Sequence, residues 1–192
     1  MHPFIKNSLS VIWIIVLLFW VYGALKTKVT LKSEGKITQF LFYWLPLLIT
    51  VYLLGPGEWF GHTWLRENFV PHNNAVGIPA IILCFLGGFI CCWARITLGK
   101  NWSLSVTIKK QHHLIISGPY KYVRHPIYTG LLLLFLGNVF IVGDYRGILA
   151  YFIISVAFWF KLKKEEQWLT TVFKDDYINY CTHTKALIPR IL

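Results

Sequence analysis

Long apolar stretches without charged residues alternate with short charged segments along most of the chain. A helix that spans a membrane needs about 20 largely apolar residues, so stretches of this length predict membrane-spanning helices. The predicted helices fall at approximately 8–25, 37–57, 73–95, 126–143 and 147–163. Barrel strands are not expected, because no stretch alternates between apolar and polar residues. The pattern predicts an all-α integral membrane protein with about five transmembrane helices in one domain, residues 1–192.

Three local features refine these helices. The fourth and fifth are separated only by residues 144–146, which predicts a tight helical hairpin. Pro46 should kink or loosen the second helix, because proline removes a backbone donor and its ring clashes with the preceding turn. The fifth apolar stretch is short, and aromatic and aliphatic residues then recur at roughly helical spacing. We therefore predict a separate amphipathic helix at 164–181 on the membrane surface or over the helix bundle.

The composition agrees with a membrane protein, and the distribution of basic residues predicts its orientation in the membrane. Of 192 residues, 56% are hydrophobic and 14% are charged, which is too apolar for an ordinary soluble domain. If the loops alternate between two sides, Lys6, Arg66 and Arg146 lie on one side and sixteen of the nineteen Lys and Arg on the other. The basic side is expected to be cytoplasmic, with the N-terminus outside and the C-terminus inside. The net charge of +11 follows from this topology, and nucleic-acid binding is not expected, because the basic residues flank spans.

A polar segment at the start of the fourth predicted helix is the first candidate for chemistry. Residues 118–130 read G-P-Y-K-Y-V-R-H-P-I-Y-T-G. Pro126 suits the first position of a helix and pushes His125 out of helical geometry, so a helix is predicted to begin at Pro126. Arg124 and His125 then lie beside a helix N-terminus, where an anionic or polyhydroxylated ligand can be held. The alternative is that Arg124 contacts lipid head groups and His125 only caps the helix.

Two blocks of sequence resemble one enzyme family. The first, residues 112–130, reads H-H-L-I-I-S-G-P-Y-K-Y-V-R-H-P-I-Y-T-G, and the second, residues 165–177, reads E-E-Q-W-L-T-T-V-F-K-D-D-Y. In this order they resemble the isoprenylcysteine carboxyl methyltransferases and their phospholipid-methyltransferase relatives. The resemblance covers about half of the chain, and it implies an integral membrane enzyme that uses S-adenosyl-L-methionine. The implied reaction is methyl transfer to a lipophilic acceptor, which can be a prenylcysteine, a phospholipid or another lipid.

The resemblance also implies which residues bind the cofactor. They are His112, His113, Leu114, Ile115, Tyr120, His125, Pro126, Ile127, Tyr128, Glu165 and Glu166. These residues are expected to form a cytoplasmic pocket in the C-terminal half of the chain. The acceptor is expected to enter from the bilayer between the third, fourth and fifth helices. No metal ion is expected.

Two further residues are candidates for catalysis and for acceptor binding. Arg124 is a candidate catalytic residue, as a positioning or electrostatic group. Lys161 stands where the carboxyl-methylating members have an arginine tied to the substrate, so it is a candidate acceptor contact. Lysine lacks the bidentate fork of arginine, which weakens the case for a prenylcysteine carboxylate more than the case for methyl transfer.

Other interpretations of the same residues stay open. His112 and His113 can belong to a polar surface loop, and Glu165 and Glu166 can simply offset neighbouring lysines. A membrane NADPH-dependent reductase of the steroid or sterol type also carries an R-H-P-x-Y element, although its usual following Gly-Glu is missing here. A non-enzymatic channel, transporter or assembly subunit is the remaining alternative. The apolar windows 7–25, 37–57, 68–94, 126–143 and 147–160 contain no Asp, Glu, Lys or Arg, which disfavours it.

Overall fold

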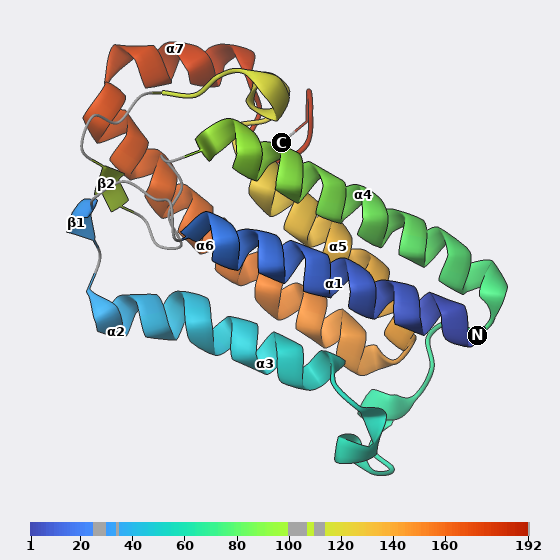
Figure 1. The fold of residues 1–192 in the computed structure, drawn as a ribbon. Helices are drawn as coiled ribbons and strands as arrows, with labels where there is room; N and C mark the ends of the chain where they lie inside the picture. The colour runs from blue at the N-terminus through green and yellow to red at the C-terminus, as the bar shows by residue number, and fades with distance from the viewer. Residues whose placement is uncertain (25–29, 34, 100–106, 110–113, 192) are drawn as a thin grey trace.

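The computed structural model describes the chain except for residues 25–29, 34, 100–106, 110–113 and 192 (Figure 1). His112 and His113 therefore lie outside the described residues. The elements in chain order are α1 (Pro3–Ala24), β1 (Thr30–Ser33), α2 (Lys36–Gln39), η1 (Phe40–Trp44), α3 (Leu45–Leu54), η2 (Gly57–Phe60), η3 (Trp64–Arg66), α4 (Asn74–Leu98), β2 (Thr107–Lys109), η5 (Gly118–Lys121), α5 (Pro126–Val142), α6 (Tyr145–Phe173) and α7 (Asp175–His183).

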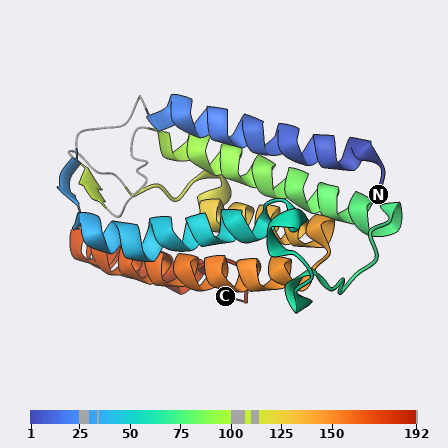
Figure 2. The ribbon, with the colours of Figure 1, turned by 90° about the horizontal axis from the view of Figure 1, so that it is seen from below.

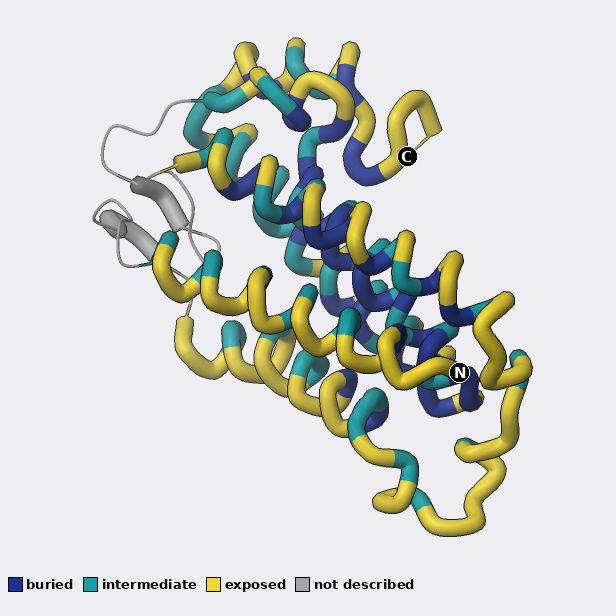
Figure 3. Tube along the Cα trace, turned by 45° about the vertical axis from the view of Figure 1, so that its right-hand side comes forward, coloured by how far each residue is buried: buried dark blue, intermediate teal, exposed yellow. Residues whose placement is uncertain are grey.

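The long helices form a bundle around α5. In Figure 2, α5 lies between α4 and α6, and both of these helices pack against it. Four helices of the described chain are long and apolar enough to cross a membrane, and α5 is a shorter apolar helix. Buried residues gather along α5 and the helix faces turned toward it, whereas the outer faces of α1, α2 and α3 are mostly exposed (Figure 3). The structure thus confirms an all-α membrane protein, to which it adds one short antiparallel pair, β1–β2.

Small residues bring α4 and α5 into backbone contact. A Cβ atom built on Gly130 lies 2.6 Å from the carbonyl oxygen of Gly87, and one built on Gly137 lies 2.4 Å from the carbonyl oxygen of Ala80. Helices in lipid associate through such close packing, because the hydrophobic effect gives no drive between them. Consequently α4 and α5 pack closely against each other around these glycines.

The second predicted span is one helix, Lys36–Leu54, with a π-helical turn inside it. This turn, η1, ends two residues before Pro46. Because Pro46 has no backbone N–H, the carbonyl one turn earlier loses its α-helical partner, and a π-turn absorbs the mismatch. The expected loosening at Pro46 takes this form.

The last long helix differs from its predicted bounds. A boundary was predicted between residues 163 and 164, but α6 continues without a break from Tyr145 to Phe173. Its 29 residues correspond to about 43 Å, longer than the hydrocarbon layer of about 30 Å. The amphipathic pattern therefore belongs to the part of α6 that leaves the membrane and to α7, which follows a turn at Lys174 with a φ of 48°.

The predicted hairpin between α5 and α6 is present and is held by a buried ion pair. Gly143 ends α5 in the left-handed conformation, with a φ of 72°. Arg146 donates to Asp144 at 2.9 Å and also to the carbonyl of Leu53 at the end of α3. This charged cluster fixes the ends of three helices on the side of the bundle opposite α7.

Candidate active site

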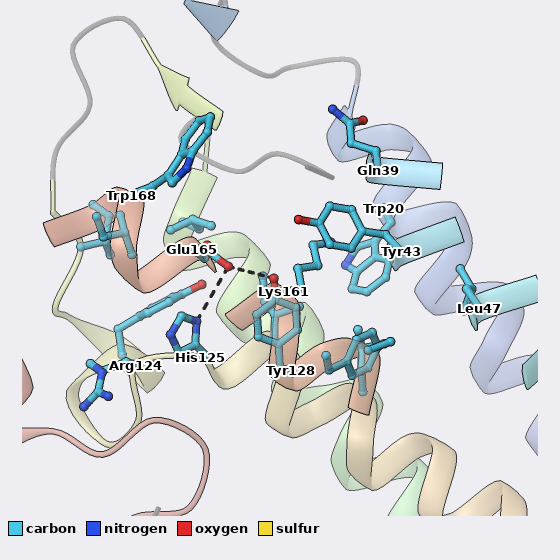
Figure 4. Close-up of a pocket in the computed structure, with 18 of the residues that line it drawn as sticks. Trp20, Gln39, Tyr43, Leu47, Arg124, His125, Tyr128, Lys161, Glu165 and Trp168 are labelled. Atoms are coloured by element: carbon cyan, nitrogen blue, oxygen red, sulfur yellow. Dashed lines mark hydrogen bonds and ion pairs between the residues drawn. The ribbon is translucent and has the colours of Figure 1, made fainter. Parts of the chain in front are cut away.

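A cavity of 710 Å³ lies among α1, η1, α3, α5, α6 and α7 (Figure 4). This volume is typical of small-molecule sites. At one end, which we call the polar end, the lining includes Tyr120, His125, Tyr128 and Glu165. The other end, the apolar end, is lined by residues such as Leu17 and Trp20 of α1 and Leu47 of α3. One cavity thus joins a polar and an apolar compartment.

The start of α5 positions the polar end. Pro126 occupies the first turn of α5, and His125 precedes it with a φ of −125° and a ψ of 59°, as the sequence predicts. Upstream, Gly118 opens η5 with a φ of 59°, and a Cβ atom there would lie 2.9 Å from the Thr97 hydroxyl. This glycine allows the chain to turn tightly against the end of α4, which buries Tyr120 and directs the chain toward His125.

Glu165 faces the cavity and is held by α5. Its Oε2 accepts a hydrogen bond of 2.8 Å from the Tyr128 hydroxyl, and His125 Nδ1 lies 3.9 Å away. The His125 and Tyr128 rings stack at 5.6 Å, so the three side chains form one group (Figure 4). The Glu165 side chain remains 36% exposed, toward the cavity, which leaves its carboxylate able to accept hydrogen bonds from a ligand.

Arg124 and Glu166 form a pair beneath this group. Arg124 donates to Glu166 Oε1 from Nε at 2.9 Å and from Nη2 at 2.6 Å, while Nη1 donates to the Thr184 carbonyl. Burial lowers the pKa of Arg124, but the contact with Glu166 outweighs it and the pKa is raised. His125 Nε2, which has no hydrogen bond within the described structure, lies 3.4 Å from Glu166 Oε1. Arg124 is thus a fixed cation that links the start of α5, α6 and the C-terminal segment.

Lys161 lies between the two ends of the cavity. Its ammonium group is 4.8 Å from the ring centre of Tyr43 and 5.8 Å from that of Tyr128. Tyr43 belongs to the π-turn η1, so the irregularity before Pro46 places an aromatic ring over this cation. Such cation–π contacts favour a charged lysine in a partly desolvated position.

The structure gathers most of the predicted site residues at one cavity. Those that line it are Leu114, Ile115, Tyr120, Arg124, His125, Ile127, Tyr128, Lys161 and Glu165. Pro126 starts α5, and Glu166 supports Arg124 and His125 without lining the cavity. The polar end comes from the C-terminal half. The apolar end comes largely from α1 and η1, which carry no motif. The acceptor route between the third, fourth and fifth helices stays a prediction, and α4 and α5 are in backbone contact on one part of it.

Aromatic residues that the sequence left unassigned also line the cavity. Trp20 and Tyr43 come from the first two spans, and Trp168, Tyr177 and Tyr180 come from the second block and α7. The helical spacing of aromatic and aliphatic residues in 164–181 includes Trp168 and Tyr177, and this spacing was the sequence feature that could have indicated them. Nothing in the local sequence marks Trp20 or Tyr43, because they lie in spans that are apolar all round.

Comparison with known proteins places this site in a family. The chain is 27% identical over 168 residues to the protein-S-isoprenylcysteine O-methyltransferase of Schizosaccharomyces pombe, covering 78% of this chain and 67% of that protein. It is 26% identical to protein-S-isoprenylcysteine O-methyltransferase B of Arabidopsis thaliana, covering 67% and 61%. It is also 26% identical to the uncharacterized protein YpbQ of Bacillus subtilis, covering 63% and 73%. The chain thus spans about two thirds of the length of these relatives.

A family model described as phospholipid methyltransferase matches residues 76–176. The match covers just over half of the 192 residues. It includes α4, α5, α6 and the group formed by His125, Tyr128 and Glu165. The chain is also similar to isoprenylcysteine methyltransferases. It therefore belongs to the phospholipid methyltransferase family.

Proposed function

We propose that this membrane protein is an S-adenosyl-L-methionine-dependent methyltransferase that acts on a lipophilic acceptor. The observation that carries the proposal is the two-part cavity. A carboxylate held by Tyr128 and His125 stands at the polar end, and an apolar compartment between α1 and α3 adjoins it. A nucleoside cofactor and a lipid can be brought together in such a cavity.

The residues of the polar end fit this cofactor. The Glu165 carboxylate would accept hydrogen bonds from ribose hydroxyls or from the ammonium group of the amino acid part. His125 lines the same end, and its Nδ1 atom lies on the side of Glu165, so it would face the same ligand. The faces of Tyr120 and Tyr128 would favour a positively charged sulfur. Leu114, Ile115 and Ile127 line the cavity and would supply apolar contacts for the base.

The contribution of the protein to this reaction is to align two partners and exclude water. When bound, the cofactor supplies an electrophilic methyl group, and transfer is an in-line displacement that depends on the orientation of the acceptor. Lys161, at the junction of the two ends, would hold an anionic head group of the acceptor. An ionised carboxylate needs no general base, so this set of side chains suits such an acceptor without further machinery.

We further propose that the acceptor enters between α1 and the helix formed by η1 and α3. Leu17 and Phe42 line the cavity from these two sides, and each is about half exposed. Backbone contact around Gly87 and Gly130 leaves little space between α4 and α5, so we favour the route beside α1. The polar end would face the cytoplasm, because most of the basic residues lie on that side.

Ligand-dependent thermal stability tests the cofactor. The detergent-purified protein is heated with S-adenosylhomocysteine, with NADPH and with neither. Binding to the native state stabilises it by about 2.7 kcal/mol at a hundredfold excess over Kd, so S-adenosylhomocysteine should raise the Tm. Stabilisation by NADPH alone would favour a reductase activity over methyl transfer. No response to either ligand would favour a non-enzymatic role. Transfer of a labelled methyl group to N-acetyl-S-farnesylcysteine or to phospholipid then distinguishes the acceptors.

A further inference from the structure

The chain after α7 returns along the start of α5. Its first four carbonyl groups, those of residues 184–187, are all hydrogen-bonded to this entrance. The backbone N–H groups of Arg124 and His125 donate to Lys185 and Ala186 at 2.8 and 3.0 Å, and the Arg124 side chain donates to Thr184. The Thr129 hydroxyl donates to the carbonyl of Leu187 at 2.7 Å. An irregular surface segment facing water has no need of a protein partner for each carbonyl group.

The depth of this segment follows from the length of α5. Exposed Glu67 and Asn68 pair with the α5–α6 turn, so this turn marks one edge of the hydrocarbon layer. From Val142 at the turn to Thr129, the helix rises only about 20 Å at 1.5 Å per residue. The hydrocarbon layer is about 30 Å thick, so Thr129 and the Leu187 carbonyl bonded to it lie roughly 10 Å inside the opposite edge. Any tilt of α5 reduces the rise and increases this depth.

Side chains of the segment agree with a position in lipid. Ala186 and Leu187 are buried against Tyr128 and Leu162, whereas Ile188 is 46% and Ile191 is 75% exposed. Pro189 between them has no N–H group that would need a partner. Non-helical backbone is tolerated at membrane depth only where the protein satisfies its polar groups. The carbonyl groups of residues 184–187 are all satisfied in this way.

We propose that residues 184–191 form a re-entrant segment, which dips into the membrane leaflet on the α7 side and contacts lipid through Ile188 and Ile191. Lys185 and Arg190, both exposed, extend their charged groups from it toward anionic lipid head groups. The segment then has two faces. One face packs against His125 and Tyr128. The other face contacts the bilayer, so the segment lies between the site and the lipid.

Spin-label accessibility in bilayers tests the position of this segment. Ile191→Cys and Ile188→Cys are made in a Cys181→Ser parent, labelled with a nitroxide and reconstituted in phosphatidylcholine vesicles that contain phosphatidylglycerol. Collisions with oxygen, which concentrates in lipid, are compared with collisions with a water-soluble nickel chelate. Phe152→Cys on the exposed face of α6 is the lipid control, and Asn179→Cys on exposed α7 is the water control. The unsubstituted parent gives the background from the native thiols of α4.

Labels at positions 188 and 191 should favour oxygen over nickel, as the label at position 152 does. A preference for nickel equal to that at position 179, at either position, would place the segment in water and overturn the proposal. This result does not depend on the cofactor or the acceptor, because neither is present. Ile191 is the more decisive position, since its side chain is 75% exposed and its substitution removes little packing.

Discussion

Glu165 and Glu166 are consecutive residues of α6, but their carboxylates face different surroundings. Glu165 accepts a hydrogen bond from Tyr128 and is 36% exposed toward the cavity, whereas the Glu166 side chain is 15% exposed and bonded to Arg124. Adjacent positions on a helix point about 100° apart, so one side chain can face the ligand while the other faces the support. The two carboxylates therefore allow binding and stability to be separated experimentally.

Substitution of Glu165 should affect ligand binding, whereas substitution of Glu166 should affect stability. Glu165→Gln should lower the affinity for S-adenosylhomocysteine about tenfold or more, because hydrogen bonds to a charged group are lost, with little change in the Tm of the free protein. Glu166→Gln should cost about 3 kcal/mol of stability, since Arg124 is left without its buried partner. Thermal unfolding with and without the ligand measures both. Equal loss of stability in the two variants would contradict the division of roles.

The packing of α4 on α5 gives a second matched pair. A Cβ atom on Gly87 would lie 2.5 Å from the carbonyl oxygen of Gly130, whereas one on Gly88 would contact side chains at 3.4 Å or more. Gly87→Ala should therefore destabilise the protein by about 3 kcal/mol, because backbone cannot move aside as a side chain can. Gly88→Ala should stay within about 1 kcal/mol of the parent and can gain from helix propensity. Unfolding in mixed detergent compares the two variants. Similar free energies of unfolding would show that α4 and α5 are not in close backbone contact at Gly87.

Much of the fold could be predicted because its signals are local. A membrane helix needs a minimum apolar length, and this requirement places every long helix. Proline chemistry fixes the start of α5 at Pro126 and the irregular turn before Pro46. The end of α6 was not predictable in this way, because Lys161 to Glu166 look like the boundary of a span although they continue the same helix as it leaves the membrane.

The apolar end of the cavity could not be predicted from the sequence. Trp20 and Leu47 lie in spans that are apolar all round, so no periodicity shows which face meets lipid and which meets the cavity. The partners of Arg124 were hidden for another reason. Glu166 and Thr184 lie 42 and 60 residues away in the chain, and only the return of the C-terminal segment brings them together.

The proposed acceptor route predicts that a larger side chain on the cavity face of α3 reduces methyl transfer. Leu47 lines the cavity, whereas its neighbour Leu48 does not and is 56% exposed on the outer surface. Leu47→Trp should reduce methyl transfer to N-acetyl-S-farnesylcysteine or phospholipid, because the larger ring fills space between α1 and α3, without changing the Tm shift given by S-adenosylhomocysteine. Leu48→Trp should leave both unchanged. If the two variants retain equal transfer, the acceptor enters elsewhere.

Lys161 should set the preference for the acceptor's charge. The ammonium group lies over the Tyr43 ring at 4.8 Å, at the junction where the head group of an acceptor would meet the cofactor. Lys161→Met should raise the KM for N-acetyl-S-farnesylcysteine about tenfold, through loss of a charged hydrogen bond, with no change in the affinity for S-adenosylhomocysteine. Lys161→Arg should lower that KM, because the guanidinium fork matches a carboxylate in two hydrogen bonds.

Lys163→Met is the control, since Lys163 is on the same helix and lies outside the cavity, 3.6 Å from Glu166. An unchanged KM in Lys161→Met would show that the acceptor's charge is recognised elsewhere, and an increase shared by Lys163→Met would mean that only the overall charge of this helix matters.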